Sequence, residues 1–191
     1  MATITAFASK RKLGKLTRVI LTVRDSEDEL GTGKSYELED VVADSTNIEQ
    51  ADPTINETEC ETSDDNIYES VTLGKYSVTL NSAVIPDELL TDAFGYTLSS
   101  DGNLYAPASY TAVWCKFEFA FDSSDDTIVI PKVKVNTKVT GASLKTGLVL
   151  GAISGTAYKE TISVGEEGSE TTIKSPFYIH TDGKASLPAA V

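Results

Sequence analysis

The chain of 191 residues is 40% hydrophobic, which is enough to close the core of one domain. Its net charge of -13 argues against a nucleic-acid binder, because so acidic a surface repels phosphates. No apolar run of signal-peptide or membrane-spanning length follows Met1, so we expect synthesis in the cytoplasm and no membrane insertion. Cys60 and Cys115 lie far apart and outside any zinc-ligand spacing, which favours two buried free thiols.

The charge is unevenly distributed along the chain. Residues 1–24 carry six Lys or Arg and no acid, residues 25–69 carry sixteen acids against one lysine, and residues 70–191 carry thirteen acids and nine lysines. This polarity is typical of a basic arm that docks on an acidic surface, including that of a neighbouring copy, and equally of a solvated surface that confers solubility. The candidate arm residues are Lys10, Arg11, Lys12 and Lys15, and the candidate acidic surface or lumen residues are Glu57, Glu59, Glu61, Asp64 and Asp65.

The first two predicted strands, 16–24 and 35–42, flank the glycine-rich stretch "DELGTGKSYELED" at 28–40. This stretch contains Gly-Lys-Ser at 33–35, the end of a phosphate-binding P-loop. The first glycine of that motif would have to fall at Asp28, and the surrounding acids would repel a phosphate. The pattern therefore predicts a hairpin and no nucleotide site.

Further strands are predicted at 54–61, 66–73 and 75–84, where apolar and polar residues alternate with a period of two. Gly74 separates the last two and is expected to be the turn of a hairpin. A second hairpin turn is predicted at Asp101-Gly102.

One short helix is predicted at about 86–94, within "IPDELLTDAFG". Pro86 suits a first-turn position, acids follow it near the positive end of the helix dipole, and Gly95 is a stop signal. A narrow apolar stripe along this helix is expected to pack on a sheet. The stripe consists of Leu89, Leu90, Ala93 and Phe94.

The clearest alternation lies in "AVWCKFEFAF" at 112–121, followed by "TIVIPKVKVN" at 127–136. Pro131 lacks a backbone donor, so the second strand should be bulged, broken or at a sheet edge. One side of it is expected to face water or a partner, and this side carries Lys132, Lys134, Asn136 and Lys138. Two last strands are predicted at 153–164 and 170–180, the latter preceded by the turn "GEEGSE".

These elements predict an all-β fold with one short flanking α-helix, either a β-sandwich or a partial barrel. The expected organisation is a basic N-terminal arm at 1–15, a single β-sandwich domain at 16–180, and a C-terminal arm at 181–191.

No catalytic constellation emerges from the residue types. His180 is the only histidine, no GxSxG surrounds a serine, and neither cysteine lies in a basic context of the kind that would lower its pKa. The acidic clusters at 62–66 and 122–126 lack the spacing of a calcium loop. A glycosidase-type pair cannot be singled out among twenty-nine acids. We expect no catalytic residue, no metal and no cofactor, and hence a protein that is not an enzyme.

Residues 49–95 resemble the tail tube proteins of long-tailed bacteriophages. The resemblance lies in an extended acidic strand through "TINETECETSD", a "GKYSVTL" strand, and a "PDELLTDAFG" helix that ends on an aromatic residue and a glycine. It covers about a quarter of the chain and is a pattern rather than an invariant motif. The strands after residue 110 are in keeping with that family.

The resemblance implies a virion protein whose copies close into a ring, six in number, with rings stacked into a tube through which DNA passes without specific binding. Partners would be further copies of the chain, a tape-measure protein, and tail-terminator or tip proteins. Related proteins form the inner tube of contractile systems. An acidic lumen would let DNA slide, because phosphate contacts give affinity.

A second reading, from a different functional class, is a monomeric β-sandwich binding module of carbohydrate-binding or adhesin type. Such a module would expose aromatic side chains on one concave face. The candidates are Trp114, Tyr105 and Tyr110.

Overall fold

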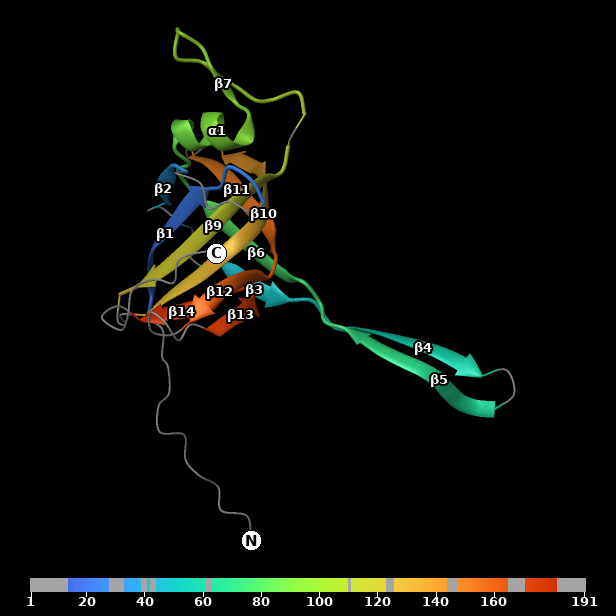
Figure 1. Ribbon diagram of the computed structural model, residues 1–191. Coiled ribbons are helices and arrows are strands. Elements are labelled where there is room, and N and C mark those ends of the chain that lie inside the picture. Colours follow the sequence, from blue (N-terminus) through green and yellow to red (C-terminus); the bar gives the residue numbers. More distant parts are fainter. Residues whose placement is uncertain are drawn as a thin grey trace.

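A computed structural model describes residues 14–27, 33–38, 41, 44–60, 63–109, 111–122, 126–143, 148–164 and 171–181. Strands dominate these residues, with one short helix, which confirms the predicted all-β fold class (Figure 1). The elements are β1 (Leu16–Val23), β2 (Ser35–Leu38), β3 (Asn47–Gln50), β4 (Thr54–Cys60), β5 (Ser63–Thr72), β6 (Tyr76–Ser82), α1 (Asp87–Phe94), β7 (Thr97–Leu98), β8 (Leu104–Tyr105), β9 (Val113–Phe121), β10 (Asp126–Ser143), β11 (Leu148–Ala157), β12 (Glu160–Val164), β13 (Thr171–Ser175) and β14 (Tyr178–Thr181).

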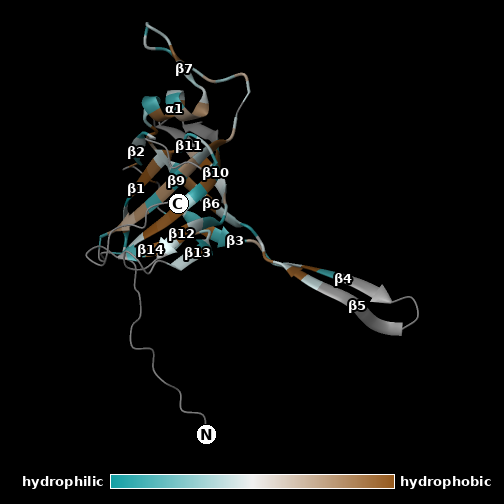
Figure 2. Ribbon diagram, viewed as in Figure 1, coloured by the Kyte–Doolittle hydropathy of each residue, from teal (hydrophilic) through white to brown (hydrophobic). Residues whose placement is uncertain are grey.

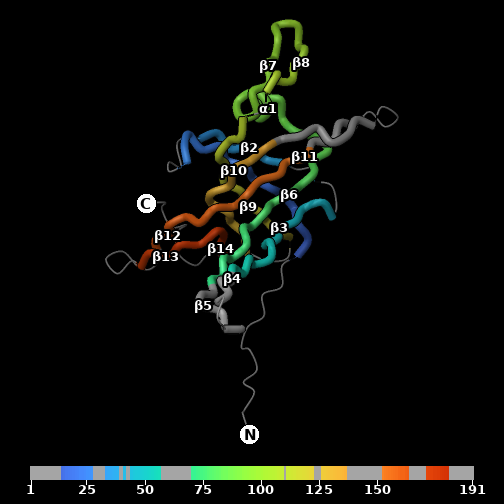
Figure 3. Tube along the Cα trace, turned by 90° about the vertical axis from the view of Figure 1, so that its right-hand side faces the viewer, coloured from blue at the N-terminus to red at the C-terminus, as the bar shows by residue number. Residues whose placement is uncertain are grey.

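The main sheet is antiparallel and has the strand order β2-β1-β9-β10-β11-β6-β3, with β14 beside the first residues of β10. Figure 3 shows β10, β11, β6 and β3 running side by side in that order. Smaller two-stranded sheets are formed by β12 with β13, β4 with β5, and β7 with β8.

The strand β9 shows why the sheet has one core face. Cys115, Phe117 and Phe119 are at most 1% exposed, whereas Lys116 and Glu118 between them are only half-buried. Successive side chains of a strand point to opposite faces, so the sequence alternation is converted directly into a buried face and a wetter one. Figure 2 shows the hydrophobic residues gathered along the strands of the body.

The main sheet curls into a partial barrel. Leu38 of β2 and Leu80 of β6 stand near opposite ends of the strand order, yet both belong to one buried cluster. A flat sheet would keep them far apart. The barrel is drawn together at one end by a bridge between Val41, just after β2, and Ser82 at the end of β6. At the other end, no ladder among the described residues joins the start of β1 to β3, which leaves an open seam.

Helix α1 covers one end of the barrel. Leu89, Ala93 and Phe94 are buried in the main core, and Leu90 packs against it half-buried. The helix ends at Gly95, whose φ of 73° is the left-handed conformation that glycine adopts without strain.

Pro131 produces a bulge inside a central strand, one of the three predicted outcomes. The register of β10 against β9 shifts between Ile130 and Val133. Both flanking strands remain paired beyond the shift, because β10 bonds β9 on one side and β11 on the other.

Two of the sequence predictions need correction at the C-terminal end. The predicted strand 153–164 divides into β11 and β12, and 170–180 divides into β13 and β14. The first break follows Ala157, where Tyr158 donates its N–H to the Lys132 carbonyl at 2.8 Å and the chain leaves the main sheet. The second break contains Pro176, which has no N–H to give to a ladder.

The hairpin predicted around Gly74 is also different. The strands on either side of Gly74 do not pair with each other, because β5 pairs with β4 and β6 pairs with β3. One long two-stranded ribbon results, with β3 and β4 in succession on one side and β5 and β6 on the other. Between its two ladders, the Ala51 N–H donates a hydrogen bond to the Lys75 carbonyl at 3.0 Å. Its distal half, the β4–β5 hairpin, stands off the body (Figure 1).

Candidate functional site

The stretch with P-loop character is the β1–β2 hairpin, as predicted. Gly33 is required there by close packing, since a Cβ at this position would lie 1.7 Å from the Val23 carbonyl oxygen. Lys34 pairs with Asp92 of α1 at 2.5 Å. Close packing against Val23 therefore accounts for Gly33, and the ion pair with Asp92 accounts for Lys34.

Asp92 joins helix α1 to β2. Its Oδ2 also accepts a hydrogen bond from the Tyr36 hydroxyl at 2.5 Å. Hydrogen bonds from Lys34 and Tyr36 hold the pKa of Asp92 below its usual range. Burial, together with the bond to the Asp92 carboxylate, raises the pKa of Tyr36 to about 12.

The described residues hold no group of three or more His, Cys, Asp or Glu side chains arranged to bind a metal ion. Within the same residues, no helix has the length and apolar character needed to span a membrane. His180 lies in β14 opposite Thr127 of β10 and is half-buried. Cys115 is a buried free thiol, and burial raises its pKa to about 12. Cys60 ends β4.

The acidic candidates fall on the projecting hairpin. Glu57 and Glu59 lie in β4, Asp64 and Asp65 lie in β5, and Glu61 lies outside the described residues. The fold thus places four of these five residues on one ribbon that contacts chiefly itself.

The base of this hairpin carries exposed apolar side chains. Ile55 and Val71 are directly paired across the two strands, and each is 55% exposed. Leu73 follows two residues after Val71 and is 64% exposed. The paired Ile55 and Val71 side chains therefore form a small exposed apolar surface at the hairpin base, and Leu73 stands just beyond the end of β5.

Of the candidate arm residues, Lys15 is part of the folded body. Its N–H bonds Asp122 Oδ1 at 2.9 Å and its carbonyl accepts the Asp122 N–H at 3.0 Å. Lys10, Arg11 and Lys12 lie outside the described residues, as does all but Thr181 of the expected C-terminal arm.

The outer face of the sheet carries a cluster of lysines and aromatic rings around Trp114. The ammonium groups of Lys132 and Lys134 each lie 5.5 Å from the Trp114 ring, within cation–π distance, and Tyr158 meets it edge-on at 5.1 Å. Lys134 and Asn136 are exposed as predicted, but Lys132 is only 8% exposed and pairs with Glu27 at 3.1 Å. The side chain of Lys138 lies outside the description.

The aromatic candidates of the binding-module reading lie on different elements. Trp114 is on β9 against Tyr158, Tyr105 is 57% exposed on β8 beyond the helix, and Tyr110 lies outside the described residues.

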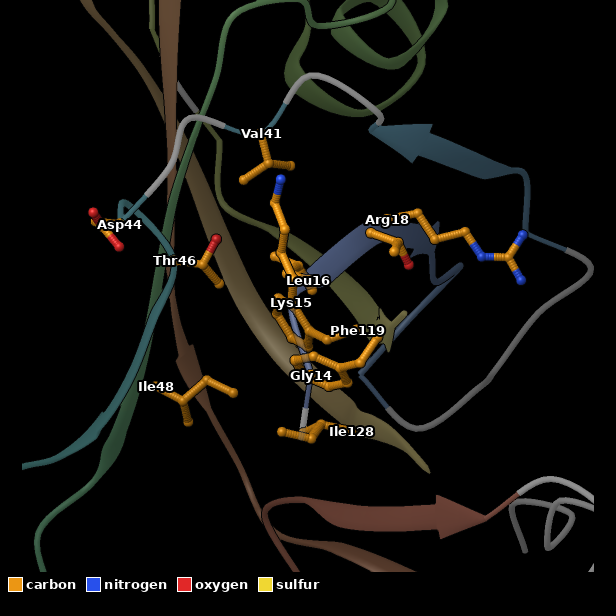
Figure 4. Close-up of a pocket in the computed structure, with 12 residues that line it drawn as sticks. Gly14, Lys15, Leu16, Arg18, Val41, Asp44, Thr46, Ile48, Phe119 and Ile128 are labelled. Atoms are coloured by element: carbon orange, nitrogen blue, oxygen red, sulfur yellow. The ribbon is translucent and has the colours of Figure 1, made fainter. Parts of the chain in front are cut away.

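A hollow of about 580 Å³ opens at the seam between the start of β1 and β3 (Figure 4). Its apolar lining comes from side chains that the core leaves partly uncovered, together with buried Phe119. Those partly buried residues are Leu16, Val41, Ile48, Phe121 and Ile128. Sequence patterning could not reveal this hollow, because it depends on how far the sheet curls.

Comparison of the chain with protein-family models, curated proteins and solved structures finds no match. The resemblance at residues 49–95 therefore stands on the sequence pattern alone, and functional inference depends on the geometry described above.

Proposed function

We propose that this chain is a non-enzymatic structural protein that assembles into stacked six-membered rings and forms a bacteriophage tail tube. DNA would pass through the tube during ejection, and the ends and interior would meet tail-terminator or tip proteins and a tape-measure protein. In this proposal the protein resides in the virion tail. The observation that carries it is the β4–β5 hairpin, which extends from the body without a covering layer.

An isolated two-stranded hairpin is only marginally stable in water. The β4–β5 hairpin receives its contacts chiefly from its own two strands, and its base exposes the Ile55–Val71 pair. Such an element gains stability when a second surface covers the apolar pair. In a self-assembling protein, a neighbouring copy of the chain would provide the surface that covers the Ile55–Val71 pair.

The edges of the main sheet support the same proposal. Strands β2 and β3 are the terminal strands of the order, and unpaired strand edges tend to pair with other chains. A head-to-tail contact between such edges closes into a ring when its rotation closes. In the assembled tube we expect the bore to carry a net negative charge, which the acidic side chains of residues 25–69 would supply.

The proposal is tested by light scattering and negative-stain microscopy of the purified protein, with and without nucleating tail proteins. We expect rings or tubes, far above the 20.4 kDa mass of one chain. The double variant Ile55→Thr, Val71→Thr keeps β-branched residues but removes apolar surface, and it should assemble poorly. Leu98→Thr, at an exposed position on β7, is the matched control.

Persistent monomers under all these conditions would contradict the proposal, as would a bore lined mainly by lysine. Deleting residues 2–12 tests the basic arm separately. Assembly of that variant at moderate salt, unchanged from the full chain, would show that the arm does not bridge copies.

A further inference from the structure

The hollow at the barrel seam has the size of a ligand site. Its volume of about 580 Å³ lies within the roughly 300–1,000 Å³ of pockets that hold small molecules. The floor is made by Phe119, Phe121 and Ile128 from β9 and β10, and Ile48 of β3 forms the facing wall. Phe119 is already buried, but Phe121, Ile128 and Ile48 are only partly buried, so an apolar group placed in the hollow would remove their remaining surface from water.

Two polar side-chain groups meet this apolar lining, and neither has a partner within the part of the chain that the structure describes. Thr46 lines the hollow, and its Oγ1 is buried without a hydrogen bond. Lys15 lines it too, and Figure 4 shows its side chain extending across the hollow toward Val41. An unsatisfied buried hydroxyl is costly, so a ligand that bonds it gains affinity.

The other charged residues at the rim are directed elsewhere. Arg18 reaches Glu37 of β2 at 3.8 Å, and Figure 4 shows its guanidinium pointing out of the hollow. The Asp44 carboxylate also points away from the hollow in that view. The Thr17 hydroxyl is already bonded to the Ala120 carbonyl at 3.1 Å. The hollow therefore presents one ammonium group and one free hydroxyl above an apolar floor.

We propose that this hollow binds a single-chain amphiphilic anion of the fatty-carboxylate type. The carboxylate accepts hydrogen bonds from Lys15 Nζ and Thr46 Oγ1, and the alkyl chain lies against Phe121, Ile128 and Ile48. Charge sign selects the head group, since the ammonium favours an anion and repels a cation. This site is independent of tube assembly and is present in a single copy of the chain.

The test is calorimetric titration of the full chain with three probes of equal chain length, the two ionic ones below their micelle concentrations and the alcohol below its solubility limit. These probes are dodecanoate, dodecanol and dodecyltrimethylammonium. We expect saturable binding of one dodecanoate per chain, at least about tenfold tighter than the cationic probe. Light scattering of the same sample reports its assembly state, so failure of this site and failure of tube assembly are read separately.

Variants locate the site. Lys15→Ala should weaken dodecanoate binding about tenfold, and Lys15→Glu should reverse the preference toward the cationic probe. Thr46→Val keeps the shape of the side chain but removes the hydroxyl, and it should also weaken the binding of dodecanoate. Lys159→Glu, at an exposed lysine outside the hollow, makes the same charge change and should leave binding as in the wild type.

Three results would overturn the proposal. They are no saturable binding of dodecanoate by the folded protein, equal affinity for all three head groups, and equal effects of Lys15→Glu and Lys159→Glu. Both lysines are exposed, so these variants should fold, and far-ultraviolet circular dichroism of each variant verifies this.

Discussion

Arg24 and Glu160 form a buried, two-pronged ion pair that joins the end of β1 to the start of β12. Arg24 Nη1 lies 2.7 Å from Glu160 Oε2, and Nη2 lies 3.1 Å from Oε1. Arg24 also donates to the carbonyls of Pro131 and Glu27 at 2.7 and 3.0 Å, while its Nε has no partner. The pair therefore links the two-stranded β12–β13 sheet to β1 of the main sheet.

Glu160→Ala should lower the free energy of unfolding by about 3–5 kcal/mol, because it leaves the Arg24 charge buried without its counterion. Urea unfolding followed by the fluorescence of Trp114, the only tryptophan, measures this loss. The matched control is Arg18→Ala, which breaks the exposed Arg18–Glu37 pair and should cost only about 0–1 kcal/mol. Equal losses in the two variants would show that burial does not decide the strength of the pair.

Tyr36→Phe should alter the alkaline limit of stability. In the unfolded chain tyrosine ionises near its ordinary pKa of 10.0, whereas in the fold Tyr36 retains its proton to about pH 12. Over that interval the folded state binds more protons, so the free energy of unfolding falls as pH rises. Tyr36→Phe removes this contribution and flattens the decline.

A residual slope should persist in Tyr36→Phe, because the pKa of Tyr178 is also raised to about 12 by burial and by the charges of Glu118 and Glu160. Unfolding titrations from pH 9 to about 12 measure both contributions. Tyr105→Phe, at a residue that is 57% exposed, is the control and should keep the wild-type profile. A profile for Tyr36→Phe identical to the wild type would contradict the assignment.

Leu89→Ala should destabilise the protein by about 2–5 kcal/mol, because Leu89 is fully buried where α1 packs on the sheet. Leu98→Ala removes the same atoms from a side chain that is 50% exposed on β7, and should change stability by about 0.5 kcal/mol or less. Urea unfolding of the two variants checks the difference. A comparable small loss for both would mean that α1 contributes little to the core.

Cys115 should resist thiol reagents in the native protein. The side chain is fully buried, and its raised pKa of about 12 leaves almost no reactive thiolate at neutral pH. The variant Cys60→Ser isolates this thiol, and its reaction with a chromogenic disulfide should begin only when denaturant unfolds the chain. Rapid modification of the folded variant would contradict this prediction.

The sequence by itself was enough for elements whose signals are local. The alternation around Phe117 and Phe119 identified β9 and its buried face, because side-chain direction in a strand follows from residue parity alone. Pro86 and Gly95 bounded α1 within one residue, because Gly95 adopts the left-handed stop and Pro86 stands directly before the helix, at the N-cap and not in the predicted first turn.

Only the tertiary structure decided the features that depend on partners distant in the chain. Arg24 and Glu160 are 136 residues apart, and the residues next to each of them give no indication that the two side chains form an ion pair. Gly74 looked like a turn, but which strands pair across it depends on β3 and β4 upstream. The hollow beneath Thr46 exists because the curled sheet closes at Val41–Ser82 and stays open at β1. Pairing and curvature are set by long-range packing, which residue patterns within one segment do not encode.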